Sequence, residues 1–249
     1  MSGELKGKVA LVLGGSSGIG EVTALAFANA GAKVAVASRR SHEGEQIVQQ
    51  IQANGGEAVF VRTDVSIESD VKDLIDKTMI EYGQIDYAFN NAGVGKAAPL
   101  TELTEADWDR IIDINLKGVF FALKYEILAM LQQGYGSIVN TASIAGVVGM
   151  ADLSAYSASK GGVIALTKSA AIEYAKSNIR INSVSLGTIE TSTLDLVPPD
   201  LLAQIVAGHP VGRIGLPIEV AEAVLWLCTS KASFVTGHNM MIDGGYTCQ

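Results

Sequence analysis

The sequence predicts an α/β fold in which a doubly wound parallel sheet of about seven strands carries helices on both faces. Short apolar runs alternate with longer helical patterns along the chain, as they do in consecutive β-α-β units. A chain of 249 residues can bury one large core, and 48% of its residues are hydrophobic. Because no linker-like or low-complexity stretch interrupts this pattern, we expect a single domain spanning 1–249.

The first unit carries a glycine-rich turn. The apolar run 8–13 is typical of a buried parallel strand, and the alanine-rich segment 21–30 is expected to be a helix that stops before Gly31. A tight glycine turn between such elements makes a phosphate cradle, because the helix N-terminus presents unpaired amides. We therefore expect a Rossmann-like, dinucleotide-binding fold whose turn contributes these residues: Gly14, Ser16, Ser17, Gly18, Ile19 and Gly20.

The second strand, 33–37, ends where the adenosine ribose of a dinucleotide is expected. It is followed by Ser38, Arg39 and Arg40 rather than by an acidic residue. A carboxylate here would bind the ribose 2′-hydroxyl of NAD, whereas a hydroxyl and two guanidinium groups suit the 2′-phosphate of NADP. The sequence thus favours NADP(H), with solvated surface arginines as the plainer alternative.

Helices and strands continue to alternate after this point. We expect a helix at 43–52, a strand at 58–61, a helix at 69–82 and a strand at 86–89. Ligands of parallel sheets bind beyond the carboxyl ends of the strands, although asparagine and glycine there also serve ordinary turns. The residues expected to border the dinucleotide at these ends are Asp64, Val65, Asn91, Ala92 and Gly93.

A long helical stretch, interrupted or gently bent, is expected over 105–131. It places Asn115 in an otherwise apolar surround, where the side-chain amide must find partners in a site or in nearby backbone. The next strand is expected at 136–141, with Ser143 just beyond its end.

The following helix, expected to extend to about residue 176, carries Tyr156 and Lys160. Residues four apart share one helical face, so the phenol and the ammonium group can reach the same space. A nearby cation lowers the pKa of a tyrosine from its usual value of about 10. Such a pair can protonate an alkoxide or deprotonate an alcohol. An isolated pair with this spacing often arises by accident, so the neighbouring motifs must decide.

The last third of the chain contains a long segment without a clear pattern. A strand at 180–184 precedes the irregular stretch 186–215, which we interpret as a substrate lid because it follows a strand's carboxyl end. A helix at 217–229 and a strand at 239–242 complete the expected fold.

Composition narrows the possible partners and locations. The formal charge is −8, which disfavours nucleic acid and anionic membranes, and no apolar run is long enough to span a bilayer. Cys228 and Cys248 lack metal-ligand spacing, and His42, His209 and His238 lie far apart, so we expect structural or surface roles. A cytoplasmic protein without a metal site is the simplest interpretation.

Taken together, the motifs resemble those of the single-domain short-chain dehydrogenase/reductase family over essentially the whole chain. The motifs that carry the resemblance, in the family's order, are Gly14, Gly18 and Gly20, then Asp64, Asn90 to Gly93, Asn115, Ser143, Tyr156 with Lys160, and Asp243 to Gly245.

The resemblance implies roles for the matching residues. Tyr156 is expected to act as general acid/base, Ser143 to polarise the carbonyl, and Lys160 to lower the tyrosine pKa and hold the nicotinamide ribose. Asn115 resembles the asparagine that helps hold a water next to this lysine. The cofactor contacts implied at the lid are Gly187, Ile189 and Thr191. The implied reaction is hydride transfer between a carbonyl carbon and the nicotinamide, without a metal.

Two positions depart from the family pattern. Leu13 stands where a threonine usually braces the glycine turn, and Leu186 stands where a proline often precedes the glycine after the sixth strand. Neither change removes a reacting group. We expect altered stability or lid dynamics rather than lost activity.

The substrate follows from the pocket rather than from the fold. The expected wall is apolar, which favours a small, uncharged, moderately hydrophobic ketone or secondary alcohol, and its residues are Ile144, Ala145, Val147, Met150 and Leu153, together with the lid.

Two alternative functions stay open. One is reduction of 3-oxoacyl groups on acyl carrier protein, although Gln132, Gln133 and Ile172 stand where such enzymes tend to carry basic docking residues. The other is a non-catalytic NADP-binding sensor or scaffold. The family is usually homotetrameric, and some relatives with a similar C-terminus bind magnesium near it, which makes Gln249 a possible ligand.

Overall fold

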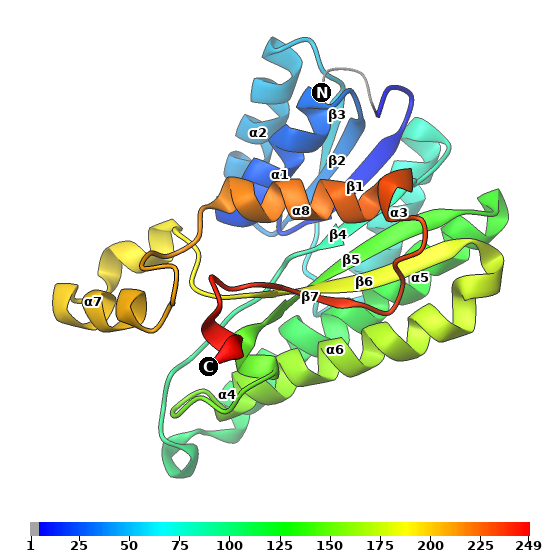
Figure 1. Ribbon diagram of the computed structural model, residues 1–249. Helices are drawn as coiled ribbons and strands as arrows, with labels where there is room; N and C mark the ends of the chain where they lie inside the picture. The colour runs from blue at the N-terminus through cyan, green and yellow to red at the C-terminus, as the bar shows by residue number, and fades with distance from the viewer. Residues whose placement is uncertain (1–4) are drawn as a thin grey trace.

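The computed structural model describes residues 5–249, apart from the side chains of Thr193 and Leu196. Its centre is a seven-stranded parallel sheet with the order β3-β2-β1-β4-β5-β6-β7 (Figure 1). The strand order reverses between β1 and β4, because β2 and β3 lie on one side of β1 and β4 to β7 lie on the other. Such a reversal opens a crevice at the carboxyl ends of the strands. The strands are β1 Val9–Leu13, β2 Lys33–Ser38, β3 Ala58–Arg62, β4 Tyr87–Asn90, β5 Gly136–Ser143, β6 Ile179–Leu186 and β7 Asn239–Ile242.

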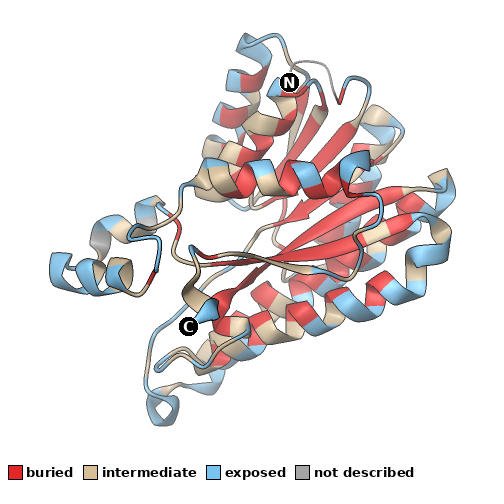
Figure 2. Cartoon of the chain, in the orientation of Figure 1, coloured by how far each residue is buried: buried red, intermediate tan, exposed pale blue. Residues whose placement is uncertain are grey.

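Helices cover both faces of this sheet. α1, α2 and α8 pack on one face, and α3, α5 and α6 pack on the other (Figures 1 and 2). The predicted α/β architecture is thereby confirmed. The α-helices are α1 Gly18–Asn29, α2 Ser41–Ala53, α3 Glu68–Tyr82, α4 Glu105–Ile112, α5 Gly118–Gln133, α6 Ser154–Tyr174, α7 Pro199–Ala207 and α8 Pro217–Cys228.

The first strand shows why its sequence is apolar throughout. Successive side chains of a strand point to opposite faces of the sheet. Leu11 and Leu13 accordingly pack into the core beneath α3, α5 and α6, whereas Ala10 and Val12 pack into the core beneath α1 and α8. Because both faces are covered by helices, every residue of β1 is buried (Figure 2).

The interruption expected within 105–131 is a π-helical turn at Asp113–Lys117, between α4 and α5. A π turn inserts an extra residue into a helix, and such turns often lie at functional sites. Here the turn buries Asn115 completely. The sequence pattern therefore located the irregularity but not its geometry.

The segment 186–215 is more ordered than predicted. It contains the 3₁₀ helix Ser192–Leu196 and the helix α7, which projects from the main body in Figure 1. The prolines suggested an irregular loop, but Pro199 occupies the first turn of α7, where its missing N–H costs no hydrogen bond. Across residues 5–249, none of the helices combines the length and apolar character needed to cross a bilayer.

Candidate active site

The glycine turn after β1 has the shape expected of a phosphate cradle. Gly14 has a φ of +77°, and a Cβ on this residue would lie only 2.8 Å from the Ala92 amide nitrogen. A larger residue would therefore be strained and would collide with the chain after β4. α1 begins at Gly18, and Ser17 makes no side-chain capping bond, so the first amides of α1 stay available to an anion.

A cavity of about 220 Å³ lies beside this turn, bordered by residues at the end of β2 and just after it. Ser38, Arg39 and Arg40 line it, and the Arg40 guanidinium donates to Ser17 Oγ over 2.6 Å and to Ser16 Oγ over 3.3 Å. Two arginines next to a helix N-terminus fit a phosphate group.

Asp64 and Val65, with Ala92, line the same cavity. Burial disfavours ionisation of the Asp64 carboxyl, but hydrogen bonds from Ser66 and the nearby Arg39 hold its pKa below the usual value. A carboxylate at this edge therefore stays charged at neutral pH. The residues predicted to surround the adenosine lie together.

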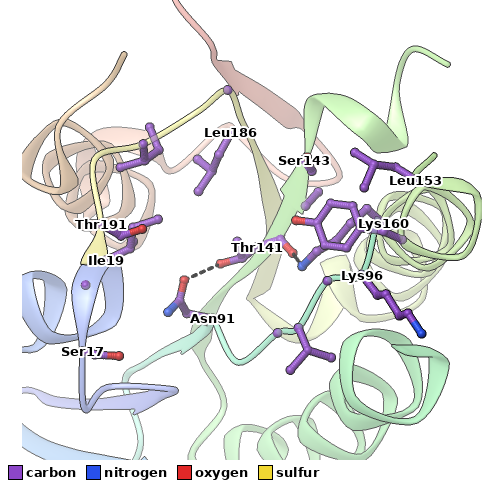
Figure 3. A pocket seen from close by; sticks show the side chains of 18 of the residues that line it. Ser17, Ile19, Asn91, Lys96, Thr141, Ser143, Leu153, Lys160, Leu186 and Thr191 are labelled. Carbon is purple, nitrogen blue, oxygen red and sulfur yellow. Dashed lines mark hydrogen bonds between the residues drawn. The ribbon is translucent and has the colours of Figure 1, made fainter. Parts of the chain in front are cut away.

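A larger cleft of about 730 Å³ opens from the glycine turn toward α6 (Figure 3). In Figure 3, Ser17, Ile19 and Thr191 lie on one side of it, and Ser143 and Lys160 lie on the other. The cleft thus joins the phosphate cradle to the residues predicted to carry the chemistry. Of the predicted cofactor contacts, those that line this cleft are Ser17, Gly18, Ile19, Asn91, Gly93, Gly187, Ile189 and Thr191.

Asn115 lies behind the cleft rather than in its wall. Its side-chain oxygen accepts from the Val94 amide and its nitrogen donates to the Val94 carbonyl, both over 2.8 Å. The same nitrogen donates to Ser159 Oγ on α6 over 3.1 Å. Asn115 therefore fixes the chain after β4 to the helix that carries Tyr156.

Lys160 is buried, and its Nζ donates to the Thr141 carbonyl over 2.7 Å. Burial lowers the pKa of Lys160 to about 8, so the ammonium form is only moderately favoured at neutral pH. The Cβ position that Gly93 leaves empty lies 3.6 Å from this Nζ and 3.4 Å from Asn115 Oδ1. The missing side chain of Gly93 therefore leaves a small polar space between the two groups.

Tyr156 is half-buried, and its ring centroid lies 5.7 Å from Lys160 Nζ. Burial raises the pKa of Tyr156, and a hydrogen bond with the Ser143 hydroxyl opposes that rise. Burial of the phenol thus acts against the lowering of its pKa that is expected from Lys160.

The lid is fastened at its root by a histidine. Gly187 donates its amide to the Ile242 carbonyl, which ties the lid to β7. His209 is 3% exposed, its Nε2 accepts from the Thr188 amide over 3.1 Å, and its Nδ1 lies 2.8 Å from the Ile205 carbonyl. This arrangement corresponds to a neutral ring. No motif marks His209, since its partners become neighbours only in the folded lid.

The apolar substrate wall predicted from the sequence needs correction. Leu153 lines the cleft, whereas Ile144, Ala145, Val147 and Met150 do not. Ile144 and Ala145 belong to the 3₁₀ helix Ile144–Gly146 and are buried, and Val147 is exposed.

Two cations were missed in this wall. Lys96, from the chain after β4, and Arg110, from α4, both line the cleft. Both residues are remote from Tyr156 and Lys160 in the sequence. Arg110 reaches the site because α4 packs against α6.

The C-terminal motif has a structural role in this structure. The Asp243 carboxylate accepts from the Gly245 amide and from the amide and hydroxyl of Thr247. The Gln249 side chain donates to the Gly208 carbonyl over 3.0 Å. Within residues 5–249 there is no group of three or more His, Cys, Asp or Glu side chains arranged to hold a metal ion.

Comparison with known proteins places the chain in a family. A sequence profile described as enoyl-(acyl carrier protein) reductase matches residues 14–247. Cyclohexanol dehydrogenase of Acinetobacter sp. (strain SE19) is 43% identical over 99% of this chain and 98% of its own length. Cis-4-hydroxycyclohexanecarboxylate dehydrogenase of Sinomonas cyclohexanicum is 42% identical, over 96% of each chain.

A solved structure agrees in sequence and in fold. The crystal structure of a short-chain type dehydrogenase/reductase from Mycobacterium marinum superposes with a TM-score of 0.95. Its sequence is 39% identical, and the match covers 99% of this chain and 98% of that one. With the glycine cradle and the cleft already described, these matches show that the chain belongs to the short-chain dehydrogenase/reductase family of nicotinamide-dependent oxidoreductases.

Proposed function

We propose that this protein is an NADP(H)-dependent oxidoreductase that interconverts a cyclic secondary alcohol and its ketone. The observation that carries the proposal is the convergence of Ser143, Tyr156 and Lys160 in one cleft that continues into the phosphate cradle. Both relatives described above are named for dehydrogenation of a ring alcohol, which supports the substrate class.

Tyr156 is the proposed general acid/base. In alcohol oxidation its phenolate oxygen takes the hydroxyl proton, and in ketone reduction the neutral phenol returns it. The Ser143 hydroxyl, which hydrogen-bonds to Tyr156, is placed to hold the substrate oxygen. A bound nicotinamide supplies the hydride acceptor or donor, which is chemistry that no side chain of the chain can provide.

Lys160 and Asn115 support this proton transfer. The Lys160 ammonium favours the phenolate when it is charged, and it lies within reach of a ribose bound in the cleft. The polar space next to Gly93, shared by Lys160 and Asn115, can hold a water that passes the proton on. Both residues therefore act on the protonation state of Tyr156 rather than on the substrate carbon.

The preference for NADP(H) rests on the cavity after β2. Arg39 and Arg40 provide two guanidinium groups and Ser38 provides a hydroxyl, whereas Asp64 is drawn to the Ser66 hydroxyl and amide. We expect the parent protein to prefer NADPH over NADH and Arg39→Asp to reverse much of that preference. Preference of the parent for NADH in steady-state assays would contradict the 2′-phosphate assignment.

The central test is Tyr156→Phe, assayed for oxidation of cyclohexanol and reduction of cyclohexanone. We expect turnover to fall by about 10³-fold, because a general acid/base typically contributes 10²- to 10⁴-fold. Cofactor binding, followed by quenching of protein fluorescence, should change little. A variant that keeps the parental rate would sink the assignment, and tight cofactor binding without turnover on any carbonyl compound would favour a sensor.

Reduction of a 3-oxoacyl thioester on acyl carrier protein is a second candidate, because the matching family profile carries the name of an acyl carrier protein reductase. Gln132, Gln133 and Ile172 offer no positive charge to an acidic carrier protein. Comparison of cyclohexanone with acetoacetyl thioesters as substrates separates the two candidates.

We also propose a homotetramer. Phe120, Leu128 and Leu131 on α5 and Trp108 on α4 are exposed apolar side chains on adjoining helices. Exposed apolar patches of this kind commonly mark subunit interfaces. Light scattering coupled to size-exclusion chromatography tests this proposal directly.

A further inference from the structure

We infer that the substrate carries a carboxylate, and that Arg110, an exposed residue of α4 that lines the cleft, binds it. This inference rests on the proposed function and narrows its substrate class to cyclic hydroxy acids and their keto acids. It differs from the sequence-based expectation of an uncharged substrate.

The first observation concerns the charged residues that line the cleft. Three lining residues, Lys96, Arg110 and Lys160, are basic and none is acidic, although the chain has 26 acidic and only 18 basic residues. Lys160 Nζ donates to the Thr141 carbonyl, and Lys96 Nζ pairs with Asp107 over 2.6 Å. Within the described part of the chain, the Arg110 side chain makes neither a hydrogen bond nor an ion pair.

The second observation is the side of the cleft on which Lys96 lies. In Figure 3 Lys96 lies on the side of Lys160 and Leu153, across the cleft from Ile19 and Thr191 of the phosphate side. A cation on this side therefore faces the substrate rather than the cofactor phosphates.

The chain segment that carries Lys96 passes beside the ring of Tyr156. The empty Cβ position of Gly95 lies 3.7 Å from Tyr156 Cδ2. Asp107, which binds Lys96, precedes Arg110 by three residues on α4, and residues three apart share one helical face. Arg110 therefore shares a helical face with the partner of Lys96 and lines the same cleft as Tyr156.

The supporting backbone holds these charges in place. Val94 is fixed by two hydrogen bonds to Asn115, and the Ala98 amide donates to the Asp152 carbonyl over 2.9 Å. At the start of α4, Thr104 and Asp107 form a reciprocal capping box. A subsite built on fixed backbone loses less entropy when it binds a ligand.

The chemistry of the free group selects the ligand. A guanidinium presents parallel N–H donors that match a carboxylate in a bidentate pair. Asp107 compensates Lys96, so the charge of Arg110 is left for an incoming anion. The phosphate of an acyl thioester shares this anionic chemistry, and the experiment below separates it from a ring carboxylate.

The test compares 4-hydroxycyclohexanecarboxylate with its uncharged carboxamide as substrates of the intact enzyme. We expect the parent to prefer the acid by at least about tenfold in kcat/KM, and Arg110→Gln to remove most of that preference through KM. Lys77→Gln, which removes one exposed cation on α3, is the matched control and should leave the acid-to-amide ratio as in the parent.

The outcomes are distinct. Equal use of acid and amide by the parent overturns the carboxylate subsite while leaving the proposed alcohol dehydrogenase intact. An acid preference that survives Arg110→Gln overturns the assignment to Arg110. An Arg110-dependent preference for reduction of acetoacetyl-CoA over reduction of the corresponding keto acid overturns the carboxylate in favour of a phosphate. Failure to oxidise acid, amide and cyclohexanol alike removes the proposed function, and the inference with it.

Discussion

Two segments flank the end of β5 and form the walls of the cleft, and each is fastened by one buried polar side chain. After β4, Asn115 makes two hydrogen bonds to the backbone of Val94. After β6, His209 bonds the amide of Thr188 and the carbonyl of Ile205. We call residues 91–98 the fixed wall and residues 186–215 the lid.

The two anchors differ in what they connect. Asn115 joins the fixed wall to Ser159 on α6, so the wall and the proposed catalytic residues Tyr156 and Lys160 share one framework. His209 connects two parts of the lid to each other, and its ring packs 5.2 Å from that of Tyr246 near the C-terminus. The comparison teaches that the fixed wall is bonded to the helix that carries Tyr156 and Lys160, whereas the lid is bonded to β7 and the C-terminal region instead.

The largest effect is expected at the anchor of the fixed wall. In Asn115→Leu, the amide and carbonyl of Val94 lose their partners, and the polar space beside Lys160 loses one wall. We expect kcat to fall by about 100-fold or more, since efficient proton transfer contributes at least that much. Stopped-flow and steady-state assays measure the loss.

Ser159→Ala is the matched control for this prediction, because it removes the hydrogen bond from Asn115 to α6 and the bond from the Ser159 hydroxyl to the Tyr156 carbonyl but leaves both bonds between Asn115 and Val94. It should retain most of kcat. If Asn115→Leu lowered the melting temperature but left kcat unchanged, Asn115 would be a purely structural anchor and the coupling between wall and chemistry would be wrong.

The root of the fixed wall contains a second, titratable anchor. Asn90, the last residue of β4, donates to Glu126 Oε2 over 3.0 Å and to Asn140 Oδ1 over 2.9 Å. Glu126 is fully buried, and burial raises its pKa to about 7. Within residues 5–249, Glu126 Oε1 and Asn90 Oδ1 are buried acceptors without a donor, so a proton on the carboxyl supplies a donor that this cluster lacks.

This proton predicts a pH-dependent stability. The folded protein keeps the Glu126 proton up to about pH 7, whereas the unfolded chain releases it near 4.5, so the free energy of unfolding falls as pH rises between these values. Glutamine has no proton to release, so in Glu126→Gln this decrease in the free energy of unfolding is absent. Relative to the parent, we expect the variant to gain up to ~3 kcal/mol between pH 5 and pH 8.

Urea unfolding at pH 5, 6, 7 and 8 measures this gain. Glu222→Gln, which removes an exposed carboxylate from α8, is the control for the change in net charge. A stability difference between Glu126→Gln and the parent that stays constant over this pH range would mean that Glu126 is ionised in the folded protein.

The parts of the molecule built on local patterns could be predicted from the sequence. The glycine turn, the strands and the face shared by Tyr156 and Lys160 depend on residues that are neighbours in the chain. Backbone geometry at Gly14, for example, admits little besides glycine. The sequence also predicted an interruption within 105–131, but the π turn at Asp113–Lys117 was seen only in the structure.

The remaining features depend on residues that meet only after folding. α7 was missed because Pro198 and Pro199 read as loop residues, although a proline fits the first turn of a helix. Arg110 was missed because α4 reaches the cleft through its packing on α6. The opposing effect of burial on the Tyr156 pKa was not foreseen, because spacing along a helix does not report how far burial disfavours the phenolate.

The smallest effect is expected at the anchor of the lid. His209→Ala leaves the Thr188 amide without its acceptor and opens a space next to Gly187, so the closed lid becomes less favourable. Because the lid is separate from the framework that holds Lys160, we expect KM to rise by roughly tenfold, the equivalent of about 1.4 kcal/mol, with a much smaller change in kcat. Steady-state kinetics separate these two parameters.

A conservative replacement distinguishes lid positioning from general packing. In His209→Gln, the side-chain oxygen can accept from the Thr188 amide and the nitrogen can donate to the Ile205 carbonyl, so both bonds of the histidine have a substitute. This variant should recover most of the lost affinity and should protect the lid from limited proteolysis better than His209→Ala. If kcat fell as steeply in His209→Ala as in Asn115→Leu, the lid and the fixed wall would form one mechanical unit. The contrast between the two anchors would then be lost.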